Sequence, residues 1–324
     1  MIEPVLRPAT LDDAALAADL MTASYPVYAQ DPVVTRYRWE RSRRGWSVGR
    51  YIAELDGHPV AFLDWLHGPP EQDPERHCEV GVYLDAARLD VDLLSFLWRW
   101  VAEQAEMTGS EILEGYAGED EPEMLEAMAR TGFERDRREK VWELDLGQHG
   151  DRLRSEAHEA RAKASADGIE LSTVAGWTDP AALTKLHALD DVTRKDIPTT
   201  FPILPEAMED FVRRASSPDR PPDRWWIALA GDRPVAMSYL RFPPVRGSVW
   251  TGYTCCDPEY RGRGIARTVK LQSLAQAAEL GVPLVYTDND AENATMLHIN
   301  ERLGYRSRPG LVGLLKRVGK KGHV

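Results

Sequence analysis

The sequence contains few of the features that mark metalloproteins, disulfide-rich secreted proteins or membrane proteins. It has only three cysteines in 324 residues, Cys78, Cys255 and Cys256, and they lack the spacing of a metal site. Adjacent cysteines rarely bridge each other, so we expect free thiols in a reducing compartment. No apolar run is long enough to span a bilayer, and the first residues lack the basic and apolar regions of a secretory signal. We therefore expect a cytoplasmic protein that does not contact a membrane.

The sequence also lacks a surplus of basic residues. Its 52 Asp and Glu residues exceed its 40 Lys and Arg residues, which gives a net charge of −12. This charge disfavours a nucleic-acid partner and weakly favours a cationic or amine ligand. The length is sufficient for two domains, each with its own core.

The most informative stretch of the sequence is residues 250–305. Residues 249–256 are rich in β-branched and aromatic side chains and predict a strand, which Asp257-Pro258 ends. A helix is predicted further on, because four apolar residues fall on one helical face: Leu271, Leu274, Ala275 and Ala278. Gly262 and Gly264 lie between the two. A glycine loop that joins a strand to a helix N-terminus is suited to binding phosphate.

Two common nucleotide motifs do not fit this loop. Arg267 occupies the place of the third glycine of the dinucleotide fingerprint, and the Gly-Lys-Ser/Thr of the Walker motif is absent. The remaining pattern, Arg261-x-x-Gly264-x-Ala266, resembles the pyrophosphate loop of the GNAT superfamily of acetyl-CoA-dependent N-acetyltransferases. The next segments match the family's second motif, with a strand over 284–287, a loop at 288–290 and a helix that opens near Asn293 and closes with Leu303-Gly304-Tyr305.

This resemblance implies a fold and a cofactor. The fold is α+β, with two GNAT-like domains, each a mixed and mostly antiparallel sheet flanked by helices, in which two central strands splay apart. The cofactor is acetyl-CoA, whose pantetheine arm enters the gap between these strands. The residues implied to bind it are Cys255, Cys256, Asp257, Arg261, Gly262, Arg263, Gly264, Ile265, Ala266, Asn293 and Asn300.

An internal repeat supports two domains. Residues of the first part recur in the second at one separation of 172 positions (281 − 109 and 304 − 132), and the pairs are Gly109 and Gly281, Met124 and Met296, Gly132 and Gly304, and Phe133 and Tyr305. We expect a degenerate copy in residues 1–147 and a copy that binds acetyl-CoA in residues 169–324. Residues 148–168 would be a linker helix or a flexible tether.

The repeat also predicts that the first copy does not bind the cofactor. At the same separation, Arg261, Gly264 and Ala266 fall on Leu89, Asp92 and Leu94. The first copy has no glycine there, and the nearby Asp85, Asp90 and Asp92 would repel a pyrophosphate. We expect this copy to be a scaffold, a pocket wall or the surface of a homodimer.

The candidate residues for the chemical step lie at position 300 and within residues 190–196. Asn300 stands where the family often has a tyrosine that protonates the leaving thiolate, and an amide can contact the thiol or pantetheine but is no useful proton donor. Asp191 and Asp196 are candidates for the general base, although capping and solvated charge are common fates of such residues. The candidate acceptor-binding residues are Asp190, Asp191, Asp196, Tyr239 and Tyr253. For Cys255 and Cys256 we expect packing rather than covalent catalysis.

The sequence therefore favours an acyltransferase that moves an acetyl group from acetyl-CoA to a primary amine of a small molecule or peptide, by direct attack in the C-terminal copy. An alternative is a non-catalytic sensor that binds acetyl-CoA. An activity like that of mycothiol synthase, which resembles this chain in its tandem architecture, is a further alternative, and Asn300 in place of the expected tyrosine counts against it.

Overall fold

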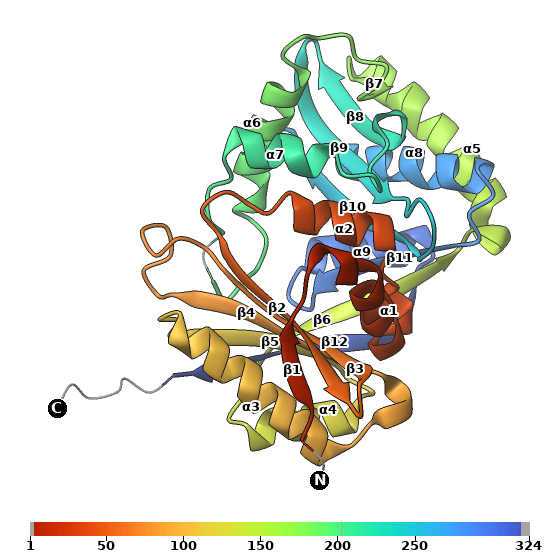
Figure 1. Cartoon of the computed structure of the whole chain (residues 1–324). Helices are drawn as coiled ribbons and strands as arrows, with labels where there is room; N and C mark the ends of the chain where they lie inside the picture. Colours follow the sequence, from red (N-terminus) through yellow and green to blue (C-terminus); the bar gives the residue numbers. More distant parts are fainter. Residues whose placement is uncertain (1–2, 202, 319–324) are drawn as a thin grey trace.

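The chain forms one continuous sheet. A computed structural model describes residues 3–201 and 203–318. In this part of the chain twelve strands pair in the order β1-β2-β3-β4-β5-β12-β6-β11-β10-β9-β8-β7 (Figure 1). The strands are β1 (Val5–Pro8), β2 (Ser47–Leu55), β3 (His58–His67), β4 (His77–Leu84), β5 (Ile112–Gly118), β6 (Glu134–Asp145), β7 (Glu170–Thr173), β8 (Trp225–Ala230), β9 (Arg233–Arg241), β10 (Val249–Cys256), β11 (Leu284–Asp290) and β12 (Arg306–Arg317).

The order of elements repeats, as the sequence predicts. We call residues 3–145 the first half and residues 169–318 the second half. The helices are α1 (Ala14–Ser24), α2 (Pro32–Glu40), α3 (Val91–Met107), α4 (Pro122–Arg130), α5 (Leu146–Ala166), α6 (Ala182–Arg194), α7 (Met208–Ala215), α8 (Ile265–Glu279) and α9 (Ala294–Leu303). The paired glycines share one conformation, because φ is 88° and 76° at Gly109 and Gly281, and 89° and 93° at Gly132 and Gly304. This left-handed conformation explains the glycines after α3, α8, α4 and α9.

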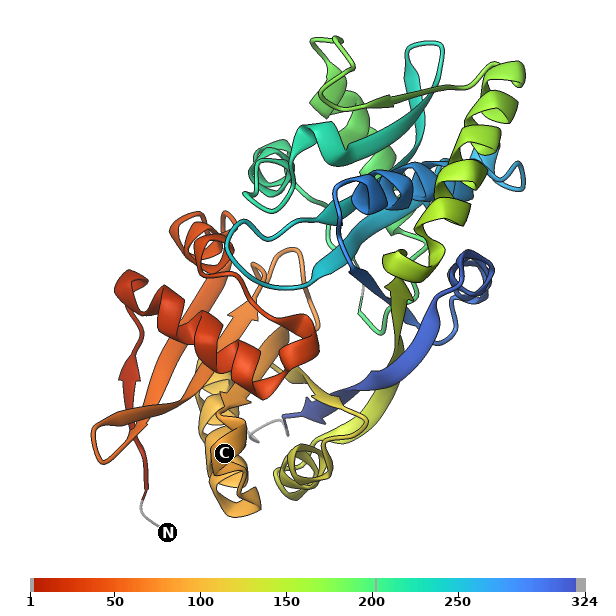
Figure 2. The same ribbon diagram turned by 90° about the vertical axis from the view of Figure 1, so that its right-hand side faces the viewer.

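The two halves exchange their last strands. β6 ends the first half but pairs with β11 of the second, and β12 ends the second half but pairs with β5 of the first. β6 and β12 also pair with each other at the centre of the sheet, where they run side by side (Figure 2). Positions 147 and 169 therefore divide the sequence without dividing the sheet, because each half is completed by a strand of the other.

β6 is longer than the sequence suggests. The pattern predicts a strand over 142–146, whereas the strand spans Glu134–Asp145. Its first residues are mostly charged, which is unusual for a strand. They pair with β12, and β11 joins the other side of β6 from Glu139 onward. Pairing with β12 therefore decides the conformation of residues 134–138, rather than local preference.

The segment between the halves is a helix. Residues 148–166 lie in α5, which packs against α8 and buries Leu153 completely. The Gln272 side chain of α8 donates a hydrogen bond of 2.7 Å to the Ala157 carbonyl of α5. Of the two alternatives for this segment, the helix is therefore correct, and a flexible tether is not.

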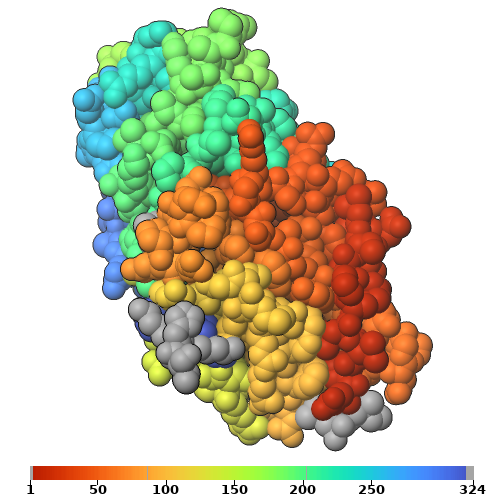
Figure 3. Space-filling model, turned by 60° about the vertical axis from the view of Figure 1, so that its left-hand side comes forward, coloured from red at the N-terminus to blue at the C-terminus, as the bar shows by residue number. Residues whose placement is uncertain are grey.

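Each half also covers part of the other half's sheet. Tyr28 of the first half packs edge-on against Trp250 of β10, with 4.7 Å between ring centroids. In the opposite direction, Phe201 of the loop between α6 and α7 packs against His77 of β4 at 3.7 Å. Figure 3 shows the surfaces of the two halves in direct contact. The described helices include none that is both long and apolar enough to cross a bilayer.

Candidate functional site

The central strands of the second half part from each other. β10 and β11 are parallel and pair only at Val249 with Val285 and at Trp250 with Tyr286. The register of β10 against β9 then shifts between Thr251 and Tyr253. Gly252 lies at this bulge, where a Cβ would meet the Tyr239 ring at 2.0 Å. The bulge bends β10 away from β11 and so leaves a gap between the strands, as the resemblance predicts.

The loop after β10 opens onto the N-terminus of α8. Gly262 and Gly264 have φ values of 75° and 79°, and space around both is open, because an added Cβ would have no neighbour within 4 Å. Gly264 is the N-cap of α8 and offers no side chain to its first amides. Unpaired amides at a helix N-terminus attract anions. The loop therefore fits the pyrophosphate of coenzyme A.

The equivalent helix of the first half is closed to such a ligand. Asp90 is the N-cap of α3, and its carboxylate accepts a hydrogen bond of 2.8 Å from the Leu93 amide. A carboxylate on the first turn satisfies the amide and repels an anion. The contrast between Asp90 and Gly264 supports one phosphate site, in the second half.

Two arginines flank the glycine loop. The Arg261 guanidinium pairs with the Asp196 carboxylate, and its Nε donates to the Cys256 carbonyl at 3.2 Å. Arg263 lies over the ring of Tyr260, 5.3 Å from its centroid. Arg261 is therefore close to the phosphate loop, but Asp196 neutralises part of its charge. Because Asp196 is paired with an arginine of this loop, its position does not favour a role as general base.

Replacing Asp196 with asparagine is expected to strengthen acetyl-CoA binding. Both partners of the pair are about half exposed, and such pairs contribute up to about 1 kcal/mol, so the gain should not exceed about fivefold. Asp191→Asn is the matched control, because Asp191 pairs with Lys195 at 3.1 Å instead. Calorimetric titration would measure both. Weaker binding by Asp196→Asn would show that the carboxylate supports the site.

The two asparagines expected at the cofactor are both held by the protein. Asn293 is the N-cap of α9 and accepts a hydrogen bond of 3.2 Å from the Met296 amide. Asn300 is completely buried. Its amide accepts a hydrogen bond of 2.8 Å from Lys270 Nζ and donates one of 2.6 Å to Asn289. Two protein groups therefore hold the Asn300 side chain in this structure, and its contact with the cofactor thiol stays a prediction.

The other candidates do not form one acceptor site. Asp190 is buried and bonds to Arg214 at 2.6 Å, whereas Asp191 is on the surface with Lys195. Tyr239 fills the space over the bulge, and the Tyr253 hydroxyl donates to Thr193 at 3.1 Å. These side chains position α6 and β10.

The cysteines are packing residues, as the sequence predicts. Cys255 packs with the core beneath α6 and α7, and Cys256 with the core beneath α8. Burial raises the pKa of the Cys255 thiol to about 12 and that of Cys256 to about 11. Neither thiol is a nucleophile at neutral pH.

A cavity of about 290 Å³ lies between the halves. Its wall includes Glu79 of β4, Glu114 of β5, Glu139 of β6 and Asp290 of β11. Burial, with repulsion from nearby carboxylates, raises the pKa of Glu114 and of Glu139 to about 7, and burial also raises that of Glu79. Within the described part of the chain, Asp290 pairs with Arg137 at 2.8 Å, but the three glutamates have no ion-pair partner. The sequence offers one sign of this site, which is charged residues inside strands.

Asp288 is a further residue that the sequence does not reveal. The loop expected at 288–290 is wrong, because β11 continues to Asp290 through its pairing with β6. Asp288 lies beyond the point where β10 leaves β11. Burial raises the pKa of its carboxyl group, which Arg241 and Lys270 partly oppose. Asp288 is thus a half-buried carboxylate at the gap, with no group of metal ligands among the described residues around it.

The comparisons agree with this geometry. Residues 189–305 match the model of the acetyltransferase (GNAT) family. A tandem GNAT protein from the clavulanic acid biosynthesis pathway superposes with a TM-score of 0.74 at 17% identity, covering 97% of this chain and 98% of its own. A GCN5-related N-acetyltransferase from Sphaerobacter thermophilus has a TM-score of 0.66 at 19% identity, with coverage of 98% and 96%. No curated protein matches the sequence.

The segment of the second half over residues 189–305 therefore matches the acetyltransferase (GNAT) family, and the whole chain has the fold of a tandem GNAT protein. An acetyltransferase of the GNAT family from Colwellia psychrerythraea also has this fold, with a TM-score of 0.59 at 12% identity over 97% of this chain and 100% of its own.

Proposed function

We propose that the second half binds acetyl-CoA and transfers its acetyl group to a primary amine. The observation that carries the proposal is the uncapped N-terminus of α8 beside the gap between β10 and β11. The amides of 262–266 and the Arg261 guanidinium would hold the pyrophosphate, and the backbone of Cys255–Asp257 would bind the pantetheine arm. Acetyl-CoA would supply an acetyl group activated as a thioester.

Asp288 would take the proton from the attacking amine. Its carboxylate lies on β11 beyond the parting of the strands, and a raised pKa makes a carboxylate a stronger base. Arg241 attracts this carboxylate and would keep it ionised enough to act. Asp191 and Asp196 are less suitable, because they pair with Lys195 and Arg261 away from Asp288.

The cavity between the halves would bind the remainder of the acceptor. Glu79 and Glu114 face each other across β4 and β5, and the cavity reaches Asp290, two residues from Asp288. An ammonium group there would stabilise the ionised form of these glutamates and so oppose the burial that raises their pKa values. The cavity therefore favours a small-molecule or peptide amine that carries a second positive charge. The first half would then be a wall of the acceptor site.

The proposal is tested by measuring the release of free thiol from acetyl-CoA in the presence of an amine. Diamines are compared with monoamines of equal length. We expect amine-dependent release, with a KM about tenfold lower for the diamine, since one buried charge contact contributes about 1.4 kcal/mol or more. The Glu79→Gln/Glu114→Gln variant should lose the preference and keep monoamine turnover. Tight acetyl-CoA binding without release for any amine would favour the sensor instead. The cytoplasmic location and the homodimer stay predictions, as does the alternative of a mycothiol synthase-like activity.

A further inference from the structure

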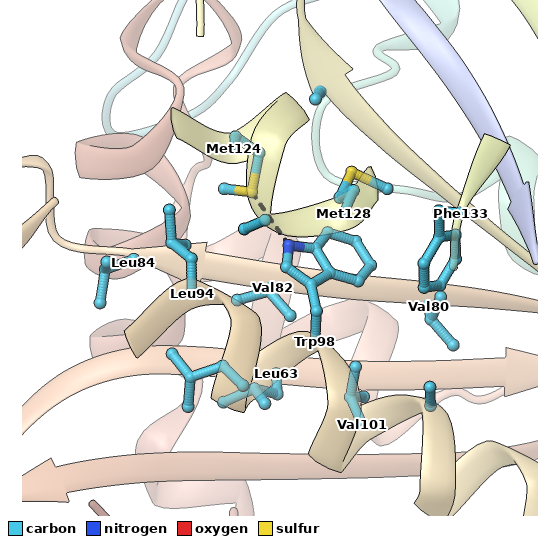
Figure 4. Packing of buried hydrophobic residues seen from close by; sticks show 14 of the residues in the cluster. Leu63, Val80, Val82, Leu84, Leu94, Trp98, Val101, Met124, Met128 and Phe133 are labelled. Carbon is cyan, nitrogen blue, oxygen red and sulfur yellow. Dashed lines mark hydrogen bonds between the residues drawn. The ribbon is translucent and has the colours of Figure 1, made fainter. Parts of the chain in front are cut away.

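Because of the internal repeat, the buried residues behind the gap can be compared with the equivalent residues of the first half. Four positions beside the parting strands are apolar in the first half and polar in the second, each 172 positions later: Trp98 and Lys270, Met128 and Asn300, Phe133 and Tyr305, and Ala117 and Asn289. In the first half the Trp98 ring fills the space between α3, α4 and β5, with Met128 and Phe133 against it (Figure 4). Its indole N–H points at the Met124 sulfur, 3.0 Å away. The first half thus shows that the fold can close this space with apolar side chains.

The second half places a charge in the same space. Lys270 is completely buried on the second turn of α8, and its Nζ lies 5.1 Å from the centroid of the Tyr305 ring. Among the described residues, the side-chain oxygen Oδ1 of Asn300 is the only hydrogen-bond acceptor within 3.5 Å of Lys270 Nζ. An ammonium has three donors, so two of them lack an acceptor. Within the described part of the chain, the buried Tyr305 hydroxyl also has no hydrogen-bond partner. Buried polar groups of this kind destabilise a fold unless a ligand satisfies them.

The position of Lys270 connects it to both parts of the site. α8 begins at the phosphate loop, and Asn300 links Lys270 to Asn289 on the diverging part of β11. Burial lowers the pKa of Lys270 to about 7, and the nearby Asp288 carboxylate opposes this shift. Lys270 thus lies behind the gap, on the α8 and α9 side of the sheet.

We propose that Lys270, oriented by Asn300, delivers the proton to the sulfur of the departing coenzyme A, in the place that Asn300 leaves without an acid. The inference rests on the proposed function. In acetyl transfer the amine nitrogen forms the new C–N bond, and the C–S bond breaks with its electron pair on sulfur. The nitrogen loses one proton to Asp288. The sulfur gains one from the Lys270 ammonium, which is restored from solvent.

The groups that face Lys270 limit what else could titrate with it. Asp288 approaches from β11 and Tyr305 from the end of α9. On α8 itself, the Ser273 hydroxyl donates to the Lys270 main-chain carbonyl, and the uncharged hydroxyls of Ser238 on β9 and Thr254 on β10 continue from it. The charged groups of α5 are engaged elsewhere on α8, Glu156 with Arg267 and Arg161 with Gln272. Lys270 and Asp288 are therefore the pair whose charges a bound thiol would sense.

The test is the ionisation of the coenzyme A thiol bound to the whole protein, followed through thiolate absorbance across pH. In the wild type the bound thiol should ionise about one pH unit below the free thiol, because the thiolate and the Lys270 ammonium stabilise each other and titrate as a coupled pair, which offsets the effect of burial on Lys270. Lys270→Met, which gives the position an apolar side chain of similar length, should remove this shift, and Lys270→Arg should keep it. Coenzyme A that lacks sulfur should bind all three proteins equally.

Each result of the thiol titration either supports the role of Lys270 or overturns it. A wild-type thiol that ionises as it does in free solution would overturn it without any variant. A shift that survives in Lys270→Met would also overturn it and leave Lys270 a structural role. Failure of coenzyme A to bind the wild type at all would instead remove the proposed function on which the inference rests. Loss of the shift in Lys270→Met, with its retention in Lys270→Arg, would support it.

Discussion

Replacing Gly264 with aspartate is expected to abolish acetyl-CoA binding. Gly264 has φ of 79°, so any side chain there is strained, by roughly 1–3 kcal/mol. The new carboxylate would also lie at the uncapped N-terminus of α8, where the pyrophosphate should bind. Two like charges about 4 Å apart near a protein surface repel by about 4 kcal/mol. Affinity should fall by a factor of about 100 or more in a calorimetric titration.

Gly281→Asp is the matched control for this variant. Gly281 follows the other end of α8, has φ of 76°, and likewise has no atom within 4 Å of an added Cβ. Both variants should lose similar stability in thermal unfolding, because both strain a left-handed glycine. Only Gly264→Asp should lose acetyl-CoA binding. Equal affinities in the two variants would place the phosphate site elsewhere.

Replacing Asp288 with asparagine is expected to lower amine-dependent turnover by about 10²–10⁴, the range for loss of a general base. Acetyl-CoA binding should change little, since the carboxylate makes no contact with the phosphate loop. Asp290→Asn is the control for kcat, because Asp290 is on the same strand but pairs with Arg137 in the wall of the acceptor cavity, where its loss should change KM instead. Steady-state kinetics with a fixed amine would measure both variants.

The pH dependence of turnover provides a second test of the role of Asp288. Burial raises the pKa of its carboxyl group above the ordinary value, and a base acts in its ionised form. Turnover of the wild type should therefore rise with pH through this raised pKa and then level off. Asp288→Asn should lack that limb. A variant that kept the limb and full turnover would show that another group accepts the proton.

The sequence predicts the glycine loop between β10 and α8 because the determinants of its conformation are local. A strand, two glycines and a helix within residues 249–279 fix where Gly264 lies, and glycine is the residue that adopts its φ of 79° without strain. The repeat is equally visible, because Gly109 and Gly281 end equivalent helices. These features depend on neighbouring residues and not on the rest of the fold.

The exchange of the last strands is not visible in the sequence. β6 and β12 follow equivalent helices, so each could pair with β5 or with β11 by pattern alone. The choice depends on contacts between residues far apart, such as Leu311 with Gly118 and Leu284 with Asp145. This choice also forms the cavity, because it brings Glu139 beside Asp290.

The sequence pattern does not predict the burial of Lys270, and the reason is different. In a helix pattern a lysine is normally assigned to the exposed face, and only the structure shows this one completely buried. The repeat contains a sign of it, since the equivalent Trp98 is a core residue. A comparison of the two halves position by position would have shown that the helix face there is internal.

The most direct test of the account is a titration of the wild-type protein with acetyl-CoA. The account predicts one site per chain, because Gly264 leaves α8 open and Asp90 closes α3. It also predicts that this binding disappears in Gly264→Asp and persists in Gly281→Asp. Two sites per chain would show that the first half binds the cofactor despite Asp90, and no binding would contradict the central claim.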